Sequence, residues 1–236
     1  MAKAGTLDSL GKDGSASRVS LFEGFTITSI GLVFEQQALE QGFRFVAGVD
    51  EVGRGCLAGP VVAGACILDP EKPLPKGIDD SKKLTAEMRE EIAAELKAEC
   101  IAYATGQVEA SEIDRINILE ATKQAMLTAI GELAPPADFL LIDALQLKMS
   151  PLPQRPIIKG DTISASIAAA SILAKTYRDD LMKVYDVEYP QYGFASHKGY
   201  GATVHWNALR EHGPCPLHRL TFNGVCTAKD EKLPLF

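Results

Sequence analysis

The most constraining feature of this sequence is an acidic, glycine-rich stretch between two apolar runs. Asp50 and Glu51 follow the apolar residues 45–49, Gly53-Arg54-Gly55 comes next, and residues 61–68 are again apolar and rich in β-branched side chains. This pattern predicts a strand, a tight glycine turn and a second strand, with both acids at the mouth of the turn. Neighbouring residues of a regular strand point to opposite faces. Both acids can therefore serve one site only if the strand ends or kinks at Glu51.

Two other interpretations of this stretch need weighing. A lone Asp-Glu pair can be the charged end of a strand at a solvated hairpin. Gly53 and Gly55 after a strand also suggest a dinucleotide-binding motif, which needs a helix to begin at its last glycine. Residues 60–68 favour a strand instead, and Gly59 falls one position too late. The sequence therefore excludes the dinucleotide-binding interpretation.

Further compact motifs follow in the chain. In order they are Asp80-Ser81-Lys82-Lys83-Leu84, Leu141-Ile142-Asp143, Lys159-Gly160-Asp161, residues 168–175, His197-Lys198-Gly199-Tyr200-Gly201 and His218-Arg219. Together with residues 50–55 they resemble ribonuclease HII (type 2 ribonuclease H) of the bacterial type, over roughly residues 35–222. Arg54 between two glycines favours this family over the related ribonucleases HIII.

The resemblance implies an α/β fold, namely an RNase H-like mixed β-sheet flanked by helices, with a helical C-terminal portion. Residues 1–25 are rich in Gly, Ser, Ala and Lys and have no apolar period, so we expect a flexible N-terminal extension there. Residues 26–222 then form the catalytic domain with its helical C-terminal part. Residues 223–236 form a C-terminal tail.

Hydrophobic periodicity predicts the remaining elements. Residues 101–108 and 139–142 read as strands, the second as one buried on both faces. Helices are expected over residues 33–41, after Thr85 as N-cap, over residues 119–133, from Asp161 for about six turns, and over residues 203–212.

Four carboxylates come from three separate elements: Asp50, Glu51, Asp143 and Asp161. Asp143 ends a buried strand, where a sheet presents active-site groups, although an Asp at that position can also simply begin a loop. Asp161 is expected at a helix N-terminus, where an Asp is most often a cap. Asp161 is a candidate metal ligand only because the other three acids are present.

Oxygen donors in this number suit Mg²⁺ or Mn²⁺ rather than zinc. Two such ions about 3.5–4 Å apart would activate water on one side of a phosphodiester and stabilise the leaving oxygen on the other. The four carboxylates are therefore expected to be both the catalytic and the metal-binding residues. The sequence contains no evident Ser/His/Asp or Cys/His set for nucleophilic catalysis.

The resemblance implies cleavage of the RNA strand of RNA/DNA hybrids, and cleavage 5′ of ribonucleotides embedded in duplex DNA, leaving a 3′-hydroxyl and a 5′-phosphate. The family's tyrosine that matches Tyr200 packs beside the ribose, whose 2′-hydroxyl separates RNA from DNA. The expected substrate-binding residues are Gly53, Arg54, Gly55, Lys82, Ser164 and Tyr200.

Two positions depart from the family pattern: Ile163 replaces a common basic residue and Ala202 a common threonine. Neither touches the acids. Another two-metal nuclease of the same fold, or a non-catalytic nucleic-acid-binding module, remains the alternative function. Loss of an acid would favour the binding module, and all four acids are present.

Composition limits the other classes of function. Hydrophobic residues make up 46% of the chain and no run is long enough to span a membrane, so we expect a cytoplasmic protein with no membrane contact. The five cysteines are scattered and form no C-x-x-C pair, which disfavours a disulfide framework or structural zinc site. The net charge of −7 is unusual for a nucleic-acid binder. Bound metal ions would offset the part of it that the active-site acids contribute.

The last five residues, Lys-Leu-Pro-Leu-Phe, place three apolar side chains on a polar tail. One expectation is that these side chains pack on their own domain. The other is that they resemble the short Gln-Leu-x-Leu-Phe peptides that dock on the bacterial sliding clamp, with Leu233, Leu235 and Phe236 as anchors. Lys232 stands in place of the usual glutamine, which should weaken such binding.

Overall fold

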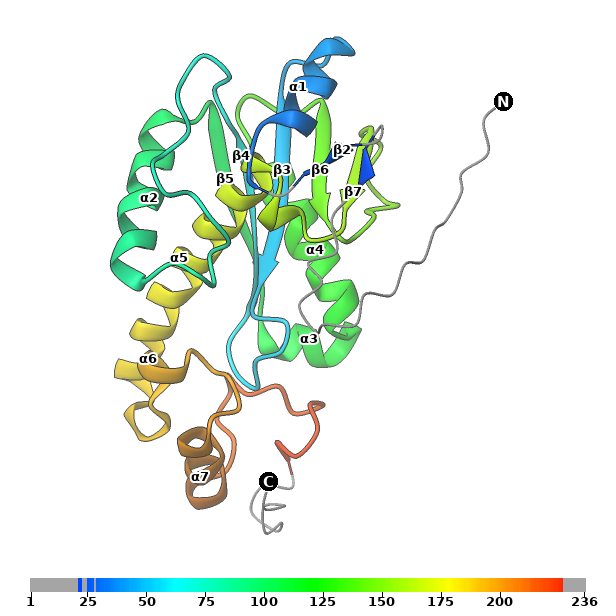
Figure 1. Ribbon diagram of the computed structural model, residues 1–236. Coiled ribbons are helices and arrows are strands. Elements are labelled where there is room, and N and C mark those ends of the chain that lie inside the picture. Colours follow the sequence, from blue (N-terminus) through cyan, green and yellow to red (C-terminus); the bar gives the residue numbers. More distant parts are fainter. Residues whose placement is uncertain (1–20, 23–24, 28, 227–236) are drawn as a thin grey trace, which may run out of the picture.

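The computed structural model describes residues 21–22, 25–27 and 29–226 (Figure 1). The expected extension lies mostly outside these residues, and Leu233, Leu235 and Phe236 lie wholly outside them. At the N-terminal end, β1 (Leu21–Phe22) pairs antiparallel with β2 (Phe25–Thr26). The domain boundary expected after residue 25 therefore falls inside a paired ribbon.

The centre of the fold is a five-stranded mixed sheet, in agreement with the prediction. Its strands lie in the order β5-β4-β3-β6-β7; β3 pairs antiparallel with β4 and parallel with β6. The strand bounds are β3 Val46–Val52, β4 Val61–Ile67, β5 Ala102–Val108, β6 Phe139–Asp143 and β7 Gln154–Ile157. β3 is the middle strand, so the acids near its end lie at the centre of the sheet edge.

Helices cover both faces of this sheet (Figure 1). The α-helices are α1 Val33–Glu40, α2 Ala86–Glu99, α3 Ala110–Ile116, α4 Ile118–Gly131, α5 Ala165–Glu188, α6 Phe194–His197 and α7 Thr203–His212. α4 packs with β3, β4 and β5 in the largest apolar cluster, and α2 and α5 pack together on the opposite face. The helices α6 and α7 follow the far end of α5 and form the expected helical C-terminal portion. None of the described helices has the length and apolarity needed to cross a bilayer.

The long helix α5 lies directly on the strands that carry the acids. A Cβ atom on Gly48 of β3 would lie 2.0 Å from the carbonyl carbon of Ser166, and one on Gly64 of β4 would lie 2.3 Å from the carbonyl oxygen of Ala170. No real Cβ atom approaches backbone so closely. Glycine in the strands and small residues four apart on the helix therefore bring α5 to within backbone contact of the sheet.

Several sequence-based boundaries need correction. β3 does not end or kink at Glu51 but continues to Val52, and residues 53–60 form a longer connection rather than a tight turn. The stated condition for Asp50 and Glu51 to serve one site was therefore wrong, because the charge of Glu51 still acts on Asp50 and on Asp143 from the regular strand. The long helix begins at Ala165, whereas Asp161 lies in a separate 3₁₀ turn, Gly160–Thr162. The apolar spacing of α5 continues upstream to Ile163, which made the predicted helix too long. Ile163 precedes the helix and packs in a separate apolar cluster with residues such as Phe34 and Ile167. The elements α3 and β7 were not predicted.

Candidate active site

Asp50 is the most deeply buried of the four acids. Asp50 lies on the middle strand β3 and is 4% exposed. Burial raises the pKa of its carboxyl well above the usual value, and the negative charges of Glu51 and Asp143 raise it further. A hydrogen bond from Ser171 of α5 acts in the opposite direction. The Ser171 hydroxyl lies 2.9 Å from that of Ser81, so helix and loop meet behind this carboxylate.

Glu51 follows on the same strand, and its side chain is 12% exposed. Its Oε1 accepts a hydrogen bond of 3.1 Å from Nη1 of Arg54, while its Oε2 has no hydrogen-bond partner among the described protein groups. Burial raises the pKa of Glu51, and the Arg54 guanidinium limits the rise. An orphaned, buried carboxylate oxygen is costly unless a cation completes it.

Asp143 ends β6, beside β3. In the parallel register Val49 lies opposite Ile142, so Asp50 and Asp143 occupy the next step, at the carboxyl ends of adjacent strands. The pKa of Asp143 is raised to about 6, mainly by burial and further by the charges of Asp161 and Glu51. The Gly160 N–H, which donates to Oδ1 at 2.7 Å, acts in the opposite direction. These mutual effects place the acids in one electrostatic cluster.

Asp161 reaches this cluster from the 3₁₀ turn after β7. Lys82 Nζ donates to its Oδ2 at 3.1 Å and lies 3.9 Å from Oδ1 of Asp80. Partial burial lowers the pKa of Lys82, but the charge and hydrogen bond of Asp161, together with the charges of Asp80 and Asp50, outweigh this, so the pKa is raised overall. The Lys82 side chain is nevertheless 75% exposed. An exposed ammonium thus supplies the positive charge that a carboxylate cluster requires.

The donor set fits hard divalent cations. All four side chains offer carboxylate oxygens, their repulsion raises the pKa values of Asp50 and Asp143, and one oxygen of Glu51 is unpartnered. Across the part of the chain that the structure describes, no three acidic, histidine or cysteine side chains converge as a complete metal-binding group. In this arrangement Asp161 is paired with Lys82.

Two fully buried arginines, Arg178 and Arg219, fix the connection between β3 and β4, residues 53–60. Arg219 donates from Nη1 to the carbonyl of Arg54 at 2.8 Å, and from Nε and Nη2 to that of Gly59 at 3.1 and 2.9 Å. Arg178 of α5 donates to the carbonyls of Pro60, Lys198 and Ala58 at 2.9, 2.8 and 3.1 Å. The loop that presents Arg54 is thus fixed through its backbone.

Sequence reasoning missed Arg178. Its signal was a charged residue in the small-residue face of α5, four residues after Ala174, where the helix lies on the sheet. Because a charge there must be buried and fully paired, its presence indicates a framework of carbonyl acceptors.

Tyr200 lies on a second loop that meets the first. The amide of Leu57 donates to the carbonyl of Gly199 at 2.8 Å, and Arg178 bonds to both loops. The Tyr200 side chain lies against Cys56, and its residue is 44% exposed. The structure therefore brings Tyr200 and Arg54, whose side chain is also exposed, to neighbouring loops at the acidic edge of the sheet.

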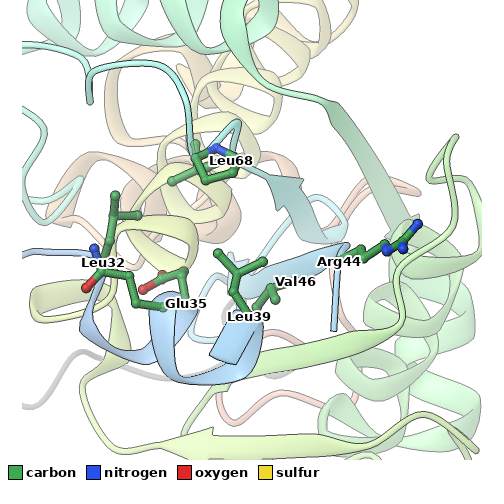
Figure 2. A pocket seen from close by; sticks show the side chains of 8 residues that line it. Leu32, Glu35, Leu39, Arg44, Val46 and Leu68 are labelled. Atoms are coloured by element: carbon green, nitrogen blue, oxygen red, sulfur yellow. The ribbon is translucent and has the colours of Figure 1, made fainter. Parts of the chain in front are cut away.

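Ser164 has a different place from the one expected of a substrate-binding side chain. It is fully buried, and its hydroxyl caps α5 by accepting from the Ile167 amide. That hydroxyl donates to Oε1 of Glu35 at 2.6 Å, and Oε1 also accepts from the Ser166 hydroxyl and amide. Glu35 in turn lines a small pocket between α1 and the end of β4 (Figure 2). The Ser164 hydroxyl therefore organises the start of α5 and does not face the solvent.

Comparisons with known proteins agree with this arrangement. The profile of the family described as Ribonuclease HII matches residues 47–225. A ribonuclease HII of Syntrophotalea carbinolica is 51% identical over 194 residues, which cover 82% of this chain and 92% of that protein. Two solved structures are similar, each with a TM-score of 0.66. One is ribonuclease H2 of Pyrococcus horikoshii OT3 (26% identity; 79% of this chain and 98% of that chain). The other is ribonuclease HII of Archaeoglobus fulgidus in complex with PCNA (25% identity; 80% and 98%).

Proposed function

The chain belongs to the ribonuclease HII family and is a ribonuclease H, and from this premise we propose its substrate and mechanism. It cleaves the RNA strand of RNA/DNA hybrids and the bond 5′ of ribonucleotides embedded in duplex DNA, leaving a 3′-hydroxyl and a 5′-phosphate. The observation that carries this proposal is the cluster of Asp50, Glu51 and Asp143 at the carboxyl ends of two adjacent strands. There the charges of Glu51 and Asp143 raise the pKa of Asp50, and the charge of Glu51 raises the pKa of Asp143. Such an edge is suited to hydrolysis assisted by divalent cations.

Ribonucleases H depend on divalent metal ions, and we propose Mg²⁺ or Mn²⁺ here, held by Asp50, Glu51, Asp143 and Asp161. When bound, two such ions would supply an activated water and stabilise the leaving oxygen. The Gly160 N–H keeps Asp143 oriented, and the Ser171 hydroxyl keeps Asp50 oriented. Lys82 exchanges its ion pair with Asp161 for a contact with the substrate phosphate, which its exposed position allows.

Ribose recognition is proposed for the two loops that Arg178 and Arg219 hold together. Gly55 leaves the backbone beside Arg54 open to close approach by a sugar, because nothing lies within 4 Å of the position that a Cβ atom would take there. Gly53, with φ of +91°, instead makes room for Arg178, whose Nε would lie 2.3 Å from a Cβ atom at that position. Tyr200 flanks the same place from the second loop and is positioned to stack on a sugar or base. Substituting Arg54 should lower the ratio of cleavage at ribose to cleavage at deoxyribose, and an unchanged ratio would remove Arg54 from this role.

The direct experiment uses a DNA duplex that carries one ribonucleotide. Incubation with Mg²⁺ should give a single cut 5′ of the ribose, with a 3′-hydroxyl that a polymerase can extend. Chelation should abolish the cut, and an all-DNA duplex should remain intact. Cleavage of the all-DNA duplex at a comparable rate would instead favour another two-metal nuclease. Binding without cleavage in both Mg²⁺ and Mn²⁺ would favour the non-catalytic module.

We further propose that the C-terminal tail contacts a sliding clamp, since another member of the family has been solved in complex with PCNA. Leu233, Leu235 and Phe236 would be the apolar anchors. Deleting residues 233–236 should leave cleavage and thermal stability unchanged and abolish retention on immobilised clamp. A marked fall in melting temperature would show that these side chains pack on their own domain. Together with the substrate, clamp contact fits a role in ribonucleotide excision repair in the cytoplasm.

A further inference from the structure

Two buried histidines connect the Tyr200 loop to the C-terminal segment that follows α7. His205 of α7 is fully buried and its Nδ1 lies 2.8 Å from the Tyr200 carbonyl oxygen. Its Nε2 lies 3.0 Å from Nε2 of His218, which is also buried. The Nδ1 of His218 then lies 2.9 Å from the amide nitrogen of Cys215. The proposed reaction uses neither imidazole.

The two backbone groups at the ends of this chain assign its proton positions. A carbonyl oxygen can only accept, so His205 must carry its proton on Nδ1 and present a lone pair on Nε2. An amide can only donate, so His218 must present a lone pair on Nδ1 and carry its proton on Nε2. The Tyr200 carbonyl and the Cys215 amide therefore independently require the same direction of hydrogen bonding. His218 donates from Nε2 to His205, and His205 donates from Nδ1 to the Tyr200 carbonyl. The Cys215 thiol and carbonyl, at 3.2 and 3.3 Å from His218 Nδ1, are longer contacts.

The surroundings keep both rings neutral and rigid. Burial lowers the pKa of His205 and of His218 to about 4. The Phe194 ring packs edge-on against His205 at 5.6 Å, and the ring of His197 stacks on His205 at 4.4 Å. Tyr192 lies 4.8 Å from His218. Water has little access to this chain of hydrogen bonds, so each lost bond would leave an unsatisfied buried atom.

The residue after His218 is Arg219, whose guanidinium holds the carbonyls of Arg54 and Gly59. One dipeptide thus reaches both loops: His218 acts through His205 on the Tyr200 loop, and Arg219 acts on the Gly53–Pro60 connection. The dipeptide is thus an anchor shared by the two loops, in addition to Arg178. We propose that His205 and His218 are positioning residues that set Tyr200 against the Arg54 loop, through a hydrogen-bond chain of fixed direction that runs from the Cys215 amide to the Tyr200 carbonyl.

This proposal rests on the function proposed for Tyr200, and it makes a spectroscopic prediction that does not depend on activity. Ring ¹⁵N shifts of the wild-type protein at neutral pH should show a protonated Nδ1 in His205 and a protonated Nε2 in His218. These are opposite tautomers in two neutral, neighbouring rings. The reverse assignment, or a doubly protonated ring, would overturn the proposal without any substitution.

The second test compares variants at His218. His218→Leu introduces an apolar side chain of similar volume and removes the donor, whereas His218→Gln can still donate to His205. His218→Leu should lower cleavage at a single embedded ribonucleotide about tenfold more than cleavage of a long hybrid, since one buried hydrogen bond is lost. His218→Gln should restore most of the difference. Asn207→Ala, at an exposed position of α7, the helix that carries His205, is the control and should leave the ratio unchanged.

The outcomes separate this proposal from the proposed function. An unchanged substrate ratio in a folded His218→Leu variant, or an equal loss in His218→Leu and His218→Gln, would overturn the positioning role. Absence of cleavage by the wild-type protein in Mg²⁺ and Mn²⁺ would contradict the proposed function instead. The tautomer assignment would still decide the hydrogen-bond chain in that case.

Discussion

Replacing Arg178 with methionine should weaken both the stability of the fold and the junction of the two substrate loops. Arg178 is fully buried and donates to three carbonyls, those of Ala58, Pro60 and Lys198. Methionine roughly keeps the volume and removes the charge, so no unpaired cation remains. Three carbonyl oxygens lose their partner, at about 1–3 kcal/mol each when they stay buried.

The loops lie near the surface, so part of this loss should be recovered by water. We therefore expect about 3 kcal/mol of destabilisation in the free energy of unfolding, near the lower limit of that sum. For a chain of this size, this corresponds to a fall in melting temperature of about 6–12 °C. Urea unfolding should give the same free-energy change with an unaltered slope, because the unfolded surface does not change.

Arg210→Met is the matched control, since Arg210 makes one hydrogen bond, to the exposed Asn207. It should change stability by less than about 0.5 kcal/mol. Arg178→Lys keeps the charge but cannot reach three carbonyls from one ammonium, so it should fall between the wild-type protein and Arg178→Met. A loss below about 1 kcal/mol in Arg178→Met would refute the reasoning that this guanidinium holds the loops together.

Three further outcomes are expected. Asp50→Asn should abolish cleavage of a hybrid in Mg²⁺ while circular dichroism shows an intact fold. Binding of the hybrid should not weaken, because a repelling charge is gone. Strong residual cleavage would contradict the two-metal assignment. Because the pKa of Asp143 is raised to about 6 from its ordinary value of 3.8, its proton is held more tightly in the folded state, so this carboxyl favours folding at low pH and loses that effect as the pH rises through 6. Mg²⁺ must displace this proton, so the Mg²⁺ affinity read from thermal shifts should be about tenfold weaker at pH 5 than at pH 8 from Asp143 alone, and Asp143→Asn should remove that difference. Tyr200→Ala should reduce cleavage at a single embedded ribonucleotide more than cleavage of a long hybrid, measured as initial rates on matched duplexes; equal losses would give Tyr200 a purely structural role.

The local elements could be predicted from the sequence because their signals are local. The strands β4, β5 and β6 and the helix α7 fall within a residue or so of the predicted ranges, and Thr85 caps α2 by accepting from the Met88 amide as expected. Apolar periodicity and cap residues act over a few neighbouring positions, so a single sequence contains them. The ordered motifs also sufficed to identify the family.

Only the tertiary structure decided how these elements form a site. Asp50 and Asp143 are far apart in the chain, and they become neighbours because β6 adds parallel to β3 in one particular register. A shift of one residue would turn each side chain to the other face of the sheet. The ion pair between Lys82 and Asp161 was likewise decided by the tertiary structure, because it depends on the position of the 3₁₀ turn that carries Asp161.

Burial was likewise decided by long-range packing. Ser164 is expected to bind substrate, but it is buried, and its hydroxyl donates to Glu35 of α1. Arg178 looks like a solvated charge on a helix, yet it is the anchor of two loops, because the glycines of β3 and β4 admit α5 to backbone contact with the sheet. The sequence by itself identified the family and supplied the four acids as candidates for the chemistry. The tertiary structure decided which candidate residues lie together at one edge of the sheet and which are buried and hold other residues in place, because that depends on contacts between residues that no local pattern connects.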